Sequence, residues 1–179
     1  MAKVEKATLA GGCFWCTEAI FRRLRGVVEV VAGYSGGEVP SPTYEAVHGS
    51  ATGYAEAIQI TFDPKVVSYE TLLEVFFKLY DPTTLDRQGA DVGSEYRSVI
   101  FYGDDNQKKS AQKVKAKIEK LGMYEDPIVT EIVPYETFYK AEGNHQKFYE
   151  KNRLYPYCQI VIDPKISKLY ADFGELVED

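Results

Sequence analysis

Two cysteines lie three positions apart in the segment Gly11-Gly12-Cys13-Phe14-Trp15-Cys16, on either side of the only tryptophan in the chain. The residues before this segment are typical of a short strand, and residues 17–24 are typical of an amphipathic helix. Cys13 is therefore expected at a helix N-terminus, where free amide groups and the helix dipole favour a thiolate. Because residues i and i+3 share a helix face, Cys13 and Cys16 can meet as a disulfide. The spacing predicts a redox centre with an apolar wall.

A second candidate group is the carboxylate of Glu56. Residues 55–62 alternate between two faces, which is typical of a strand, and Glu56 falls on the same side as Ile58 and Ile60. A carboxylate on an apolar side must be paired or protonated to be tolerated there. Glu56 is therefore either an acid in a buried site or a strand-end residue that reaches water or pairs with Arg97.

Three further polar side chains, Tyr44, Asp91 and Tyr96, lie in two polar loops that cover residues 35–53 and 83–97. Loops on a rigid scaffold commonly display functional groups. For a single tyrosine among the 14 in this chain, a packing role is the simpler interpretation. These three residues are candidate substrate-binding groups.

The aromatic pair Phe14 and Trp15 separates the two thiols of the first segment. Unless they are simply core residues, two large rings there hinder the approach of a partner backbone and shape a small apolar pocket. A pocket with a thiolate, an acid and phenolic donors fits reduction of a sulfoxide, because the oxygen must be protonated before it leaves. Attack by Cys13 would leave a sulfenic acid, which condenses readily with another thiol, here Cys16 or Cys158.

The remaining pattern indicates how these groups are positioned. Strands are predicted over residues 4–9, 27–34, 55–62, 98–102 and 128–133, and helices over residues 17–24, 69–80 and from Asp104 or Asp105 to Gly122. The order β-α-β-β-α-β up to residue 102 resembles a ferredoxin-like two-layer α+β sandwich, with a mixed or antiparallel sheet. Residues 134–179 are expected to form a largely irregular tail that wraps the core. We expect residues 1–179 to form a single catalytic domain.

Composition excludes several classes of function. The 179 residues are 45% hydrophobic and carry a net charge of −6, which argues against binding to nucleic acid or to an anionic membrane. No apolar stretch is long enough for a signal peptide or a membrane span, and three cysteines do not make a secreted disulfide framework, so a cytoplasmic location is expected. Zinc is the rival interpretation of the cysteine pair, but a second paired ligand motif is missing and no metal site is expected.

Several independent motifs follow one another between Ala10 and about Lys168. They are Gly12-Cys13-Phe14-Trp15, Gly33-Tyr34-Ser35-Gly36-Gly37, Pro42-Thr43-Tyr44, Gly53-Tyr54-Ala55-Glu56, Arg87-Gln88-Gly89-Ala90-Asp91-Val92-Gly93 with Tyr96-Arg97-Ser98, and His145-Gln146. Together they resemble peptide methionine sulfoxide reductase of the A type. The resemblance implies reduction of the S epimer of methionine sulfoxide, free or in peptides and oxidised proteins. It also implies an external reductant, thioredoxin or dithiothreitol, in place of a bound cofactor.

The same resemblance implies a role for each matching residue. Cys13 would be the nucleophile and Glu56 the acid that protonates the oxygen. Phe14 and Trp15 would hold the substrate methyl group. Tyr44 and Tyr96 would hydrogen-bond the oxygen, and Asp91 would position the substrate through water. A protein dithiol–disulfide oxidoreductase is the alternative function, and a non-catalytic redox-sensing or metal-binding module is a third.

The sequence departs from the common family pattern at Cys16, Tyr54 and Glu95, where Gly, His and Gln are frequent. It also lacks a pair of distal cysteines, and Cys158 is the only thiol in the tail. Cys16 closes a small ring with Cys13, but a disulfide within one helical turn is strained. Cys158 lies in a segment rich in Pro and Tyr that could move over the site, and the sequence favours it slightly as the resolving thiol.

Overall fold

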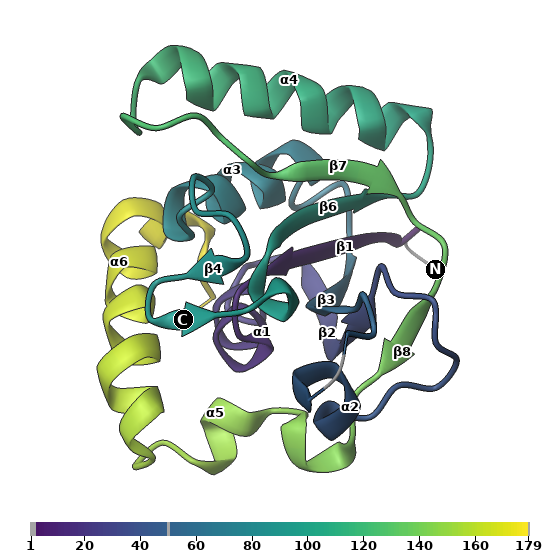
Figure 1. The fold of residues 1–179 in the computed structure, drawn as a ribbon. Helices are drawn as coiled ribbons and strands as arrows, with labels where there is room; N and C mark the ends of the chain where they lie inside the picture. The colour runs from purple at the N-terminus through teal and green to yellow at the C-terminus, as the bar shows by residue number, and fades with distance from the viewer. Residues whose placement is uncertain (1–2, 50, 179) are drawn as a thin grey trace.

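The computed structural model describes residues 3–49 and 51–178. Within that part of the chain, six strands form one sheet in the order β7-β6-β1-β3-β2-β8 (Figure 1). All neighbouring strands are antiparallel except the parallel pair β6 and β7. The strands are β1 (Glu5–Gly11), β2 (Val27–Ser35), β3 (Ala55–Phe62), β6 (Ser98–Tyr102), β7 (Glu131–Pro134) and β8 (Phe138–Lys140). A separate hairpin joins β4 (Arg87–Gln88) to β5 (Asp91–Val92).

The helices begin and end at residues whose chemistry explains the boundary. They are α1 (Phe14–Phe21), α2 (Tyr44–Gly49), α3 (Tyr69–Leu79), α4 (Asp105–Leu121), α5 (Phe148–Lys151) and α6 (Asp163–Phe173), with a π-helical segment at Cys158–Ile162 and single 3-10 turns at Ser94–Tyr96, Gly143–His145 and Gly174–Leu176. Ser68 caps α3 by accepting a hydrogen bond from the Thr71 amide at 3.0 Å. Asp104 caps α4 in the same way, and Gly122 ends it in the left-handed conformation with φ 62°. These two helices follow their sequence pattern closely.

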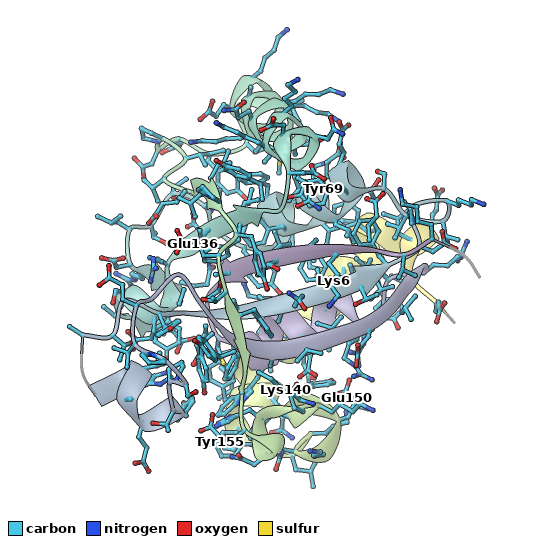
Figure 2. The ribbon with its side chains drawn as sticks, turned by 90° about the vertical axis from the view of Figure 1, so that its right-hand side faces the viewer. Lys6, Tyr69, Glu136, Lys140, Glu150 and Tyr155 are labelled. Atoms are coloured by element: carbon cyan, nitrogen blue, oxygen red, sulfur yellow. The ribbon has the colours of Figure 1, made fainter. Side chains whose placement is uncertain are left out.

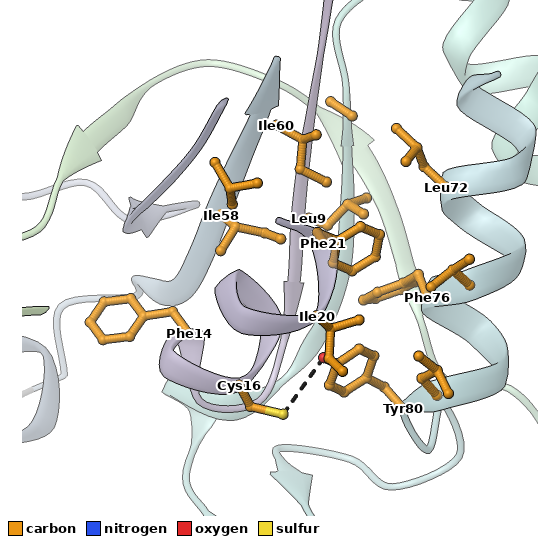
Figure 3. Close-up of a cluster of buried hydrophobic side chains, with 14 of the residues drawn as sticks. Leu9, Phe14, Cys16, Ile20, Phe21, Ile58, Ile60, Leu72, Phe76 and Tyr80 are labelled. Carbon is orange, nitrogen blue, oxygen red and sulfur yellow. Dashed lines mark hydrogen bonds between the residues drawn. The ribbon is translucent and has the colours of Figure 1, made fainter. Parts of the chain in front are cut away.

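The two faces of the sheet are covered by different elements. On one face, α1 and α3 bury the larger core, to which β3 contributes Ile58, Ile60 and Phe62 (Figure 3). On the other face, the chain that runs from β7 to β8 packs Val133 and Phe138 onto a smaller cluster (Figure 2). The protein is therefore an α+β fold with a mixed sheet. Glu56 lies on the helix-covered side of β3, as the alternation predicts.

Two regions are more regular than the sequence indicates. The loop 35–53 contains α2, which at six residues is too short to show a periodic pattern. The expected irregular tail, residues 134–179, contains β8, α5, the π-helical segment and α6. Helix α6 has Ile166, Leu169 and Phe173 at helical spacing, an apolar pattern that the expectation of an irregular tail overlooked. The helix packs against α1 and α3, and this places the tail beside the cysteine segment (Figure 1).

Candidate active site

Cys13 is the N-cap residue of α1, which begins at Phe14, three residues before the predicted helix start at residue 17. Strand β1 delivers it through Gly11 and Gly12, and Gly12 adopts φ +92°, which side chains rarely tolerate. A Cβ at Gly12 would also lie 2.7 Å from the side chain of Gln88. The Cys13 carbonyl accepts the amide of Cys16 at 3.1 Å, which closes the first turn of the helix. The position of the thiol at a helix N-terminus is as expected.

The ionisation of Cys13 is not as the sequence analysis expects. Burial, followed by the Glu56 carboxylate, raises the pKa of Cys13 well above its ordinary value, and the smaller effects of the Trp15 amide and the Tyr157 hydroxyl do not offset it. The side chain is only 8% exposed. Desolvation therefore outweighs the helix dipole, and the resting residue is a thiol.

Glu56 is buried and held from two sides. Its Oε2 accepts a hydrogen bond from the Phe14 amide at 2.9 Å, and its Oε1 lies 2.7 Å from Nε2 of His48, a charge contact outside ideal hydrogen-bond alignment. Burial raises the pKa of Glu56, whereas His48 and the Phe14 amide oppose that rise. Arg97 is not its partner, because that guanidinium donates to the Gly53 carbonyl at 2.8 Å. The strand-end interpretation of Glu56 is therefore wrong, because the side chain is buried and does not pair with Arg97.

The two predicted tyrosines near this carboxylate come from different elements, Tyr44 from α2 and Tyr96 from the 3-10 turn Ser94–Tyr96. The His48 ring lies between Tyr44 and Tyr96, with centroid distances of 4.0 and 5.9 Å. Nδ1 of His48 contacts the Tyr44 carbonyl at 2.7 Å. Burial and then the Glu56 charge raise the pKa of Tyr44 to about 12, and the same two causes raise the pKa of Tyr96. Both phenols are therefore hydrogen-bond donors at neutral pH.

Phe14 and Trp15 occupy different environments. Phe14 is fully buried among the rings of Tyr34, Tyr44 and His145, and it points away from Cys16 on the other side of α1 (Figure 3). Trp15 is partly exposed and stacks on Phe148, with centroids 3.7 Å apart. Its Nε1 donates to Nδ1 of His145 at 3.0 Å, so the orientation of the indole is fixed by a polar contact.

The sequence assigned no role to the residues that support these rings. The carboxylate of Glu142 accepts one hydrogen bond from the Tyr34 hydroxyl and one from the Tyr44 amide, each at 3.0 Å. Burial lowers the pKa of His145, which keeps its ring neutral and its Nδ1 free to accept from Trp15. The available signal was that the chain has only two histidines, and both lie in this site.

Asp91 lies on the other side of the cysteine segment. Its Oδ2 accepts a hydrogen bond from the hydroxyl of Tyr157 at 2.6 Å, which connects the β4–β5 hairpin to the tail. Both residues line a cavity of about 180 Å³ that also contains Cys13 and Cys16. Tyr157 is a further residue to which the sequence assigned no role.

Cys158 does not face this cavity. It is the first residue of the π-helical segment and is 0% exposed, and the residues of the tail that line the cavity are Tyr157, Val161 and Lys165. The expectation of a loose segment around it is wrong, because residues 158–173 form continuous helical structure. All three cysteines are free thiols.

A buried thiol at a helix N-terminus, next to a buried acid and phenolic donors, defines a thiol-dependent reductase on an α+β scaffold. The family model of peptide methionine sulfoxide reductase matches residues 5–175. The chain belongs to this family, and it is an enzyme that reduces methionine sulfoxide.

Named relatives and solved structures agree with this assignment. The chain is 57% identical over 173 residues to peptide methionine sulfoxide reductase MsrA of Sulfolobus acidocaldarius, covering 96% of this chain and 97% of the relative. It is 50% identical to MsrA of Thermus thermophilus, covering 97% of each. Reduced Mxr1 of Saccharomyces cerevisiae superposes with a TM-score of 0.80 at 37% identity, covering 88% of this chain and 90% of that one.

Two further structures extend the comparison. Methionine sulfoxide reductase A of Corynebacterium diphtheriae gives a TM-score of 0.78 at 31% identity, covering 86% of this chain and 77% of that one. Mxr1 in complex with Trx2 gives a TM-score of 0.56 at 29% identity, covering 82% of this chain and 86% of that one.

The helices of the described residues include none with the length and apolar character that a membrane span requires. Residues 3–49 and 51–178 also contain no group of three or more His, Cys, Asp and Glu side chains arranged to hold a metal ion.

Proposed function

We propose that this enzyme reduces the S epimer of methionine sulfoxide, free or in peptides, with Cys13 as nucleophile and Glu56 as acid. The observation that carries the proposal is the link between the two: the amide that follows Cys13 donates to Glu56 at 2.9 Å. The acid is thereby held beside the nucleophile, inside an apolar site. A buried carboxyl group with a raised pKa is suited to donate a proton near neutral pH.

The chemical step balances with these two groups. The Cys13 proton passes to the sulfoxide oxygen by way of Glu56, and the thiolate attacks the substrate sulfur. This attack forms an S–S bond. The hydroxyl group then passes from the substrate sulfur to the Cys13 sulfur, so the substrate S–O bond and the S–S bond break and the thioether is released. The substrate sulfur gains the electron pair that the Cys13 sulfur loses, which leaves Cys13 as a sulfenic acid.

The aromatic residues define the binding pocket. Tyr44 and Tyr96 flank His48, which contacts Glu56, and this supports a role for both phenols in donating hydrogen bonds to the substrate oxygen. Trp15 offers a partly exposed ring to the methyl group, whereas Phe14, predicted for the same role, is fully buried and packs against Tyr44 and His145. With the oxygen and the methyl group both held, the two epimers direct the remaining chain of the substrate differently, which supports selection of one epimer.

Asp91 has a less direct role in this scheme. Its hydrogen bond with Tyr157 holds the rim of the cavity beside Cys13. A carboxylate at that position can bind the substrate backbone through water. We therefore assign Asp91 to substrate positioning.

Reduction of the oxidised enzyme requires an external dithiol. The Saccharomyces Mxr1 structure in complex with Trx2 supports a thioredoxin-type protein as the reductant of this enzyme as well. Dithiothreitol should replace it in vitro. The absence of a bound cofactor stays a prediction, as does the cytoplasmic location.

We also propose that the scaffold is a ferredoxin-like sandwich within a single catalytic domain, residues 1–179. The β-α-β-β-α-β unit from β1 to β6 has the strand order β6-β1-β3-β2, with antiparallel neighbours throughout. Strands β7 and β8 extend this unit at its two edges. The strand order and the antiparallel pairing are the two observations that support this fold.

Turnover of a peptide that contains methionine S-sulfoxide, with dithiothreitol as reductant, tests the proposal. We expect turnover by the wild type, none by Cys13→Ser, and little on the R epimer. Turnover that survives in Cys13→Ser would remove Cys13 as the nucleophile. Reduction of insulin disulfides without any sulfoxide turnover would favour the dithiol–disulfide oxidoreductase instead.

A further inference from the structure

Glu18 is a buried carboxylate on α1 that the reduction step described above does not use. Its residue is only 1% exposed, and it lies three positions after Trp15 in the same helix. Residues i and i+3 share a helix face, so Glu18 and Trp15 present their side chains to the same part of the tail. Because a buried carboxylate is costly unless its oxygens are hydrogen-bonded, the partner of Glu18 indicates what it does.

That partner is the backbone of Lys147, at the start of α5, a helix that packs against α1 (Figure 1). Both carboxylate oxygens of Glu18 accept the Lys147 amide, at 2.9 and 3.0 Å. Lys147 is the N-cap residue of α5 and has φ 54° and ψ 37°, a left-handed conformation that residues other than glycine rarely adopt. Its own side chain makes no capping hydrogen bond. Glu18 therefore holds, from a neighbouring helix, the turn at which the tail enters α5.

This turn carries the two residues that hold the indole of Trp15. Nδ1 of His145, two positions before Lys147, accepts a hydrogen bond from Nε1 of Trp15 at 3.0 Å. Phe148, the residue after Lys147, stacks on the indole with centroids 3.7 Å apart and 6° between the planes. The ring is thus fixed at its edge and on one face by the segment 145–148.

The segment 145–148 has a second anchor, on the sheet. The side-chain amide of Gln146 donates to the Ala32 carbonyl at 2.8 Å and accepts from the Ala32 amide at 3.0 Å. Gln146 thereby fixes the segment to β2, whereas Glu18 fixes it to the helix that carries Trp15. The Glu18 contact is the one that relates the two supports of the indole to α1.

We propose that Glu18 is a positioning residue for substrate binding: by holding the Lys147 amide, it sets the orientation of the Trp15 indole that receives the substrate methyl group. In this scheme Glu18 acts as a hydrogen-bond acceptor and works through the tail, not on the reacting atoms. The inference rests on the proposed function, because that function gives the indole its role.

The charges around Glu18 agree with an acceptor that works in either protonation state. Burial raises the pKa of Glu18 to about 7, and the Lys147 amide and then Arg22 oppose that rise. Nη1 of Arg22 lies 3.9 Å from Oε1 of Glu18, and Glu150 and Lys151 on α5 act on it with opposite signs. A neutral carboxyl group keeps an oxygen that can accept the amide, so the contact does not require the charge.

Two substitutions of similar size separate the acceptor from the packing of Glu18. Glu18→Gln keeps an oxygen that can accept the Lys147 amide, whereas Glu18→Met fills a similar volume and leaves that amide without its partner. The matched control is Glu29→Met, which removes an exposed carboxylate from the cavity of about 470 Å³ that Glu18 also lines. Because Trp15 is the only tryptophan, protein fluorescence reports on its ring without any substrate.

We expect the emission of Glu18→Met to shift to the red and its quenching by acrylamide to increase, because the indole loses its fixed supports and meets more water. KM for the methionine sulfoxide peptide should rise about 3- to 10-fold, with a smaller change in kcat. Glu18→Gln and Glu29→Met should match the wild type in both measurements. Wild-type fluorescence and KM in Glu18→Met, or equal losses in Glu18→Gln and Glu18→Met, would overturn the assignment.

A measurement on the wild type and Glu18→Gln decides the contact if Glu18→Met does not fold. The Lys147 amide proton should change its NMR chemical shift as Glu18 titrates near pH 7 in the wild type, and this change should be absent in Glu18→Gln. A Lys147 amide that shows no such change in the wild type would remove Glu18 as its acceptor and overturn the proposal. The fluorescence and NMR measurements need no turnover, so failure to reduce the sulfoxide peptide would count against the proposed function only.

Discussion

His48 and Glu56 form a buried contact in which Nε2 of the imidazole lies 2.7 Å from Oε1 of the carboxylate. Burial lowers the pKa of His48, but the contacts with Glu56 and the Tyr44 carbonyl outweigh it and raise the pKa overall. The pKa of Glu56 is raised by burial and lowered in part by His48. The acid of the proposed mechanism is therefore adjusted by a histidine on a helix that the sequence did not predict.

Removal of His48 should widen the pH range of the enzyme on its alkaline side. Glu56 acts while protonated, so activity falls as pH rises through its pKa. Without the imidazole, the pKa of Glu56 rises further, and His48→Gln should lose kcat/KM at a higher pH than the wild type, by about one unit. Profiles of kcat/KM from pH 5 to 10 measure this shift, and superimposable alkaline limbs would show that His48 does not act on Glu56.

Substitution of Glu56 separates proton donation from packing. Glu56→Ala removes the donor and should slow formation of the sulfenic acid by about 10²- to 10⁴-fold. Glu56→Gln should keep much of the activity, because an amide still donates a hydrogen bond. Single-turnover rates followed by the fluorescence of Trp15 measure both, with the exposed Glu38→Ala as control. Equal rates for the wild type and Glu56→Ala would exclude the acid role.

Loss of the His145 acceptor should weaken substrate binding. In His145→Phe the Nε1–H of Trp15 has no partner in a largely buried site, at a cost of about 1–3 kcal/mol, and the ring is free to turn. We expect KM for the sulfoxide peptide to rise about 5- to 10-fold with a smaller change in kcat. His145→Gln keeps an acceptor and should lie closer to the wild type. A KM that is the same in all three proteins would contradict the role of this hydrogen bond.

Glu18 should make the stability of the protein depend on pH. It is buried in α1, where it accepts the Lys147 amide, and burial raises its pKa from 4.5 to about 7. The folded state holds this proton more tightly than the unfolded state, so its stabilising effect is complete below pH 4.5 and is lost as pH rises through 7.

Glu18→Gln should therefore be more stable than the wild type at pH 8, by about 1–2 kcal/mol, and similar to it at about pH 4.5. Urea unfolding at the two pH values measures the difference, with the exposed Glu175→Gln as control. A difference that does not depend on pH would assign the effect to packing.

The sequence carried the parts of this enzyme that depend on local pattern. The turn of Gly11 and Gly12 before an apolar segment placed Cys13 at a helix start, and the alternation in β3 placed Glu56 on the buried face. Both inferences need only the periods of a helix and a strand, which are properties of neighbouring residues. The α3 and α4 boundaries followed from caps for the same reason.

The tertiary structure alone decided the contacts between residues that are distant in the chain. His48 meets Glu56, His145 meets Trp15 and Lys165 meets Tyr80 only because the sheet order and the path of the tail bring them together. The ionisation of Cys13 belongs to the same class, because desolvation is set by everything that packs around a group. A helix start favours a thiolate, but the surrounding core keeps Cys13 a thiol, and no property of its own segment determines that balance.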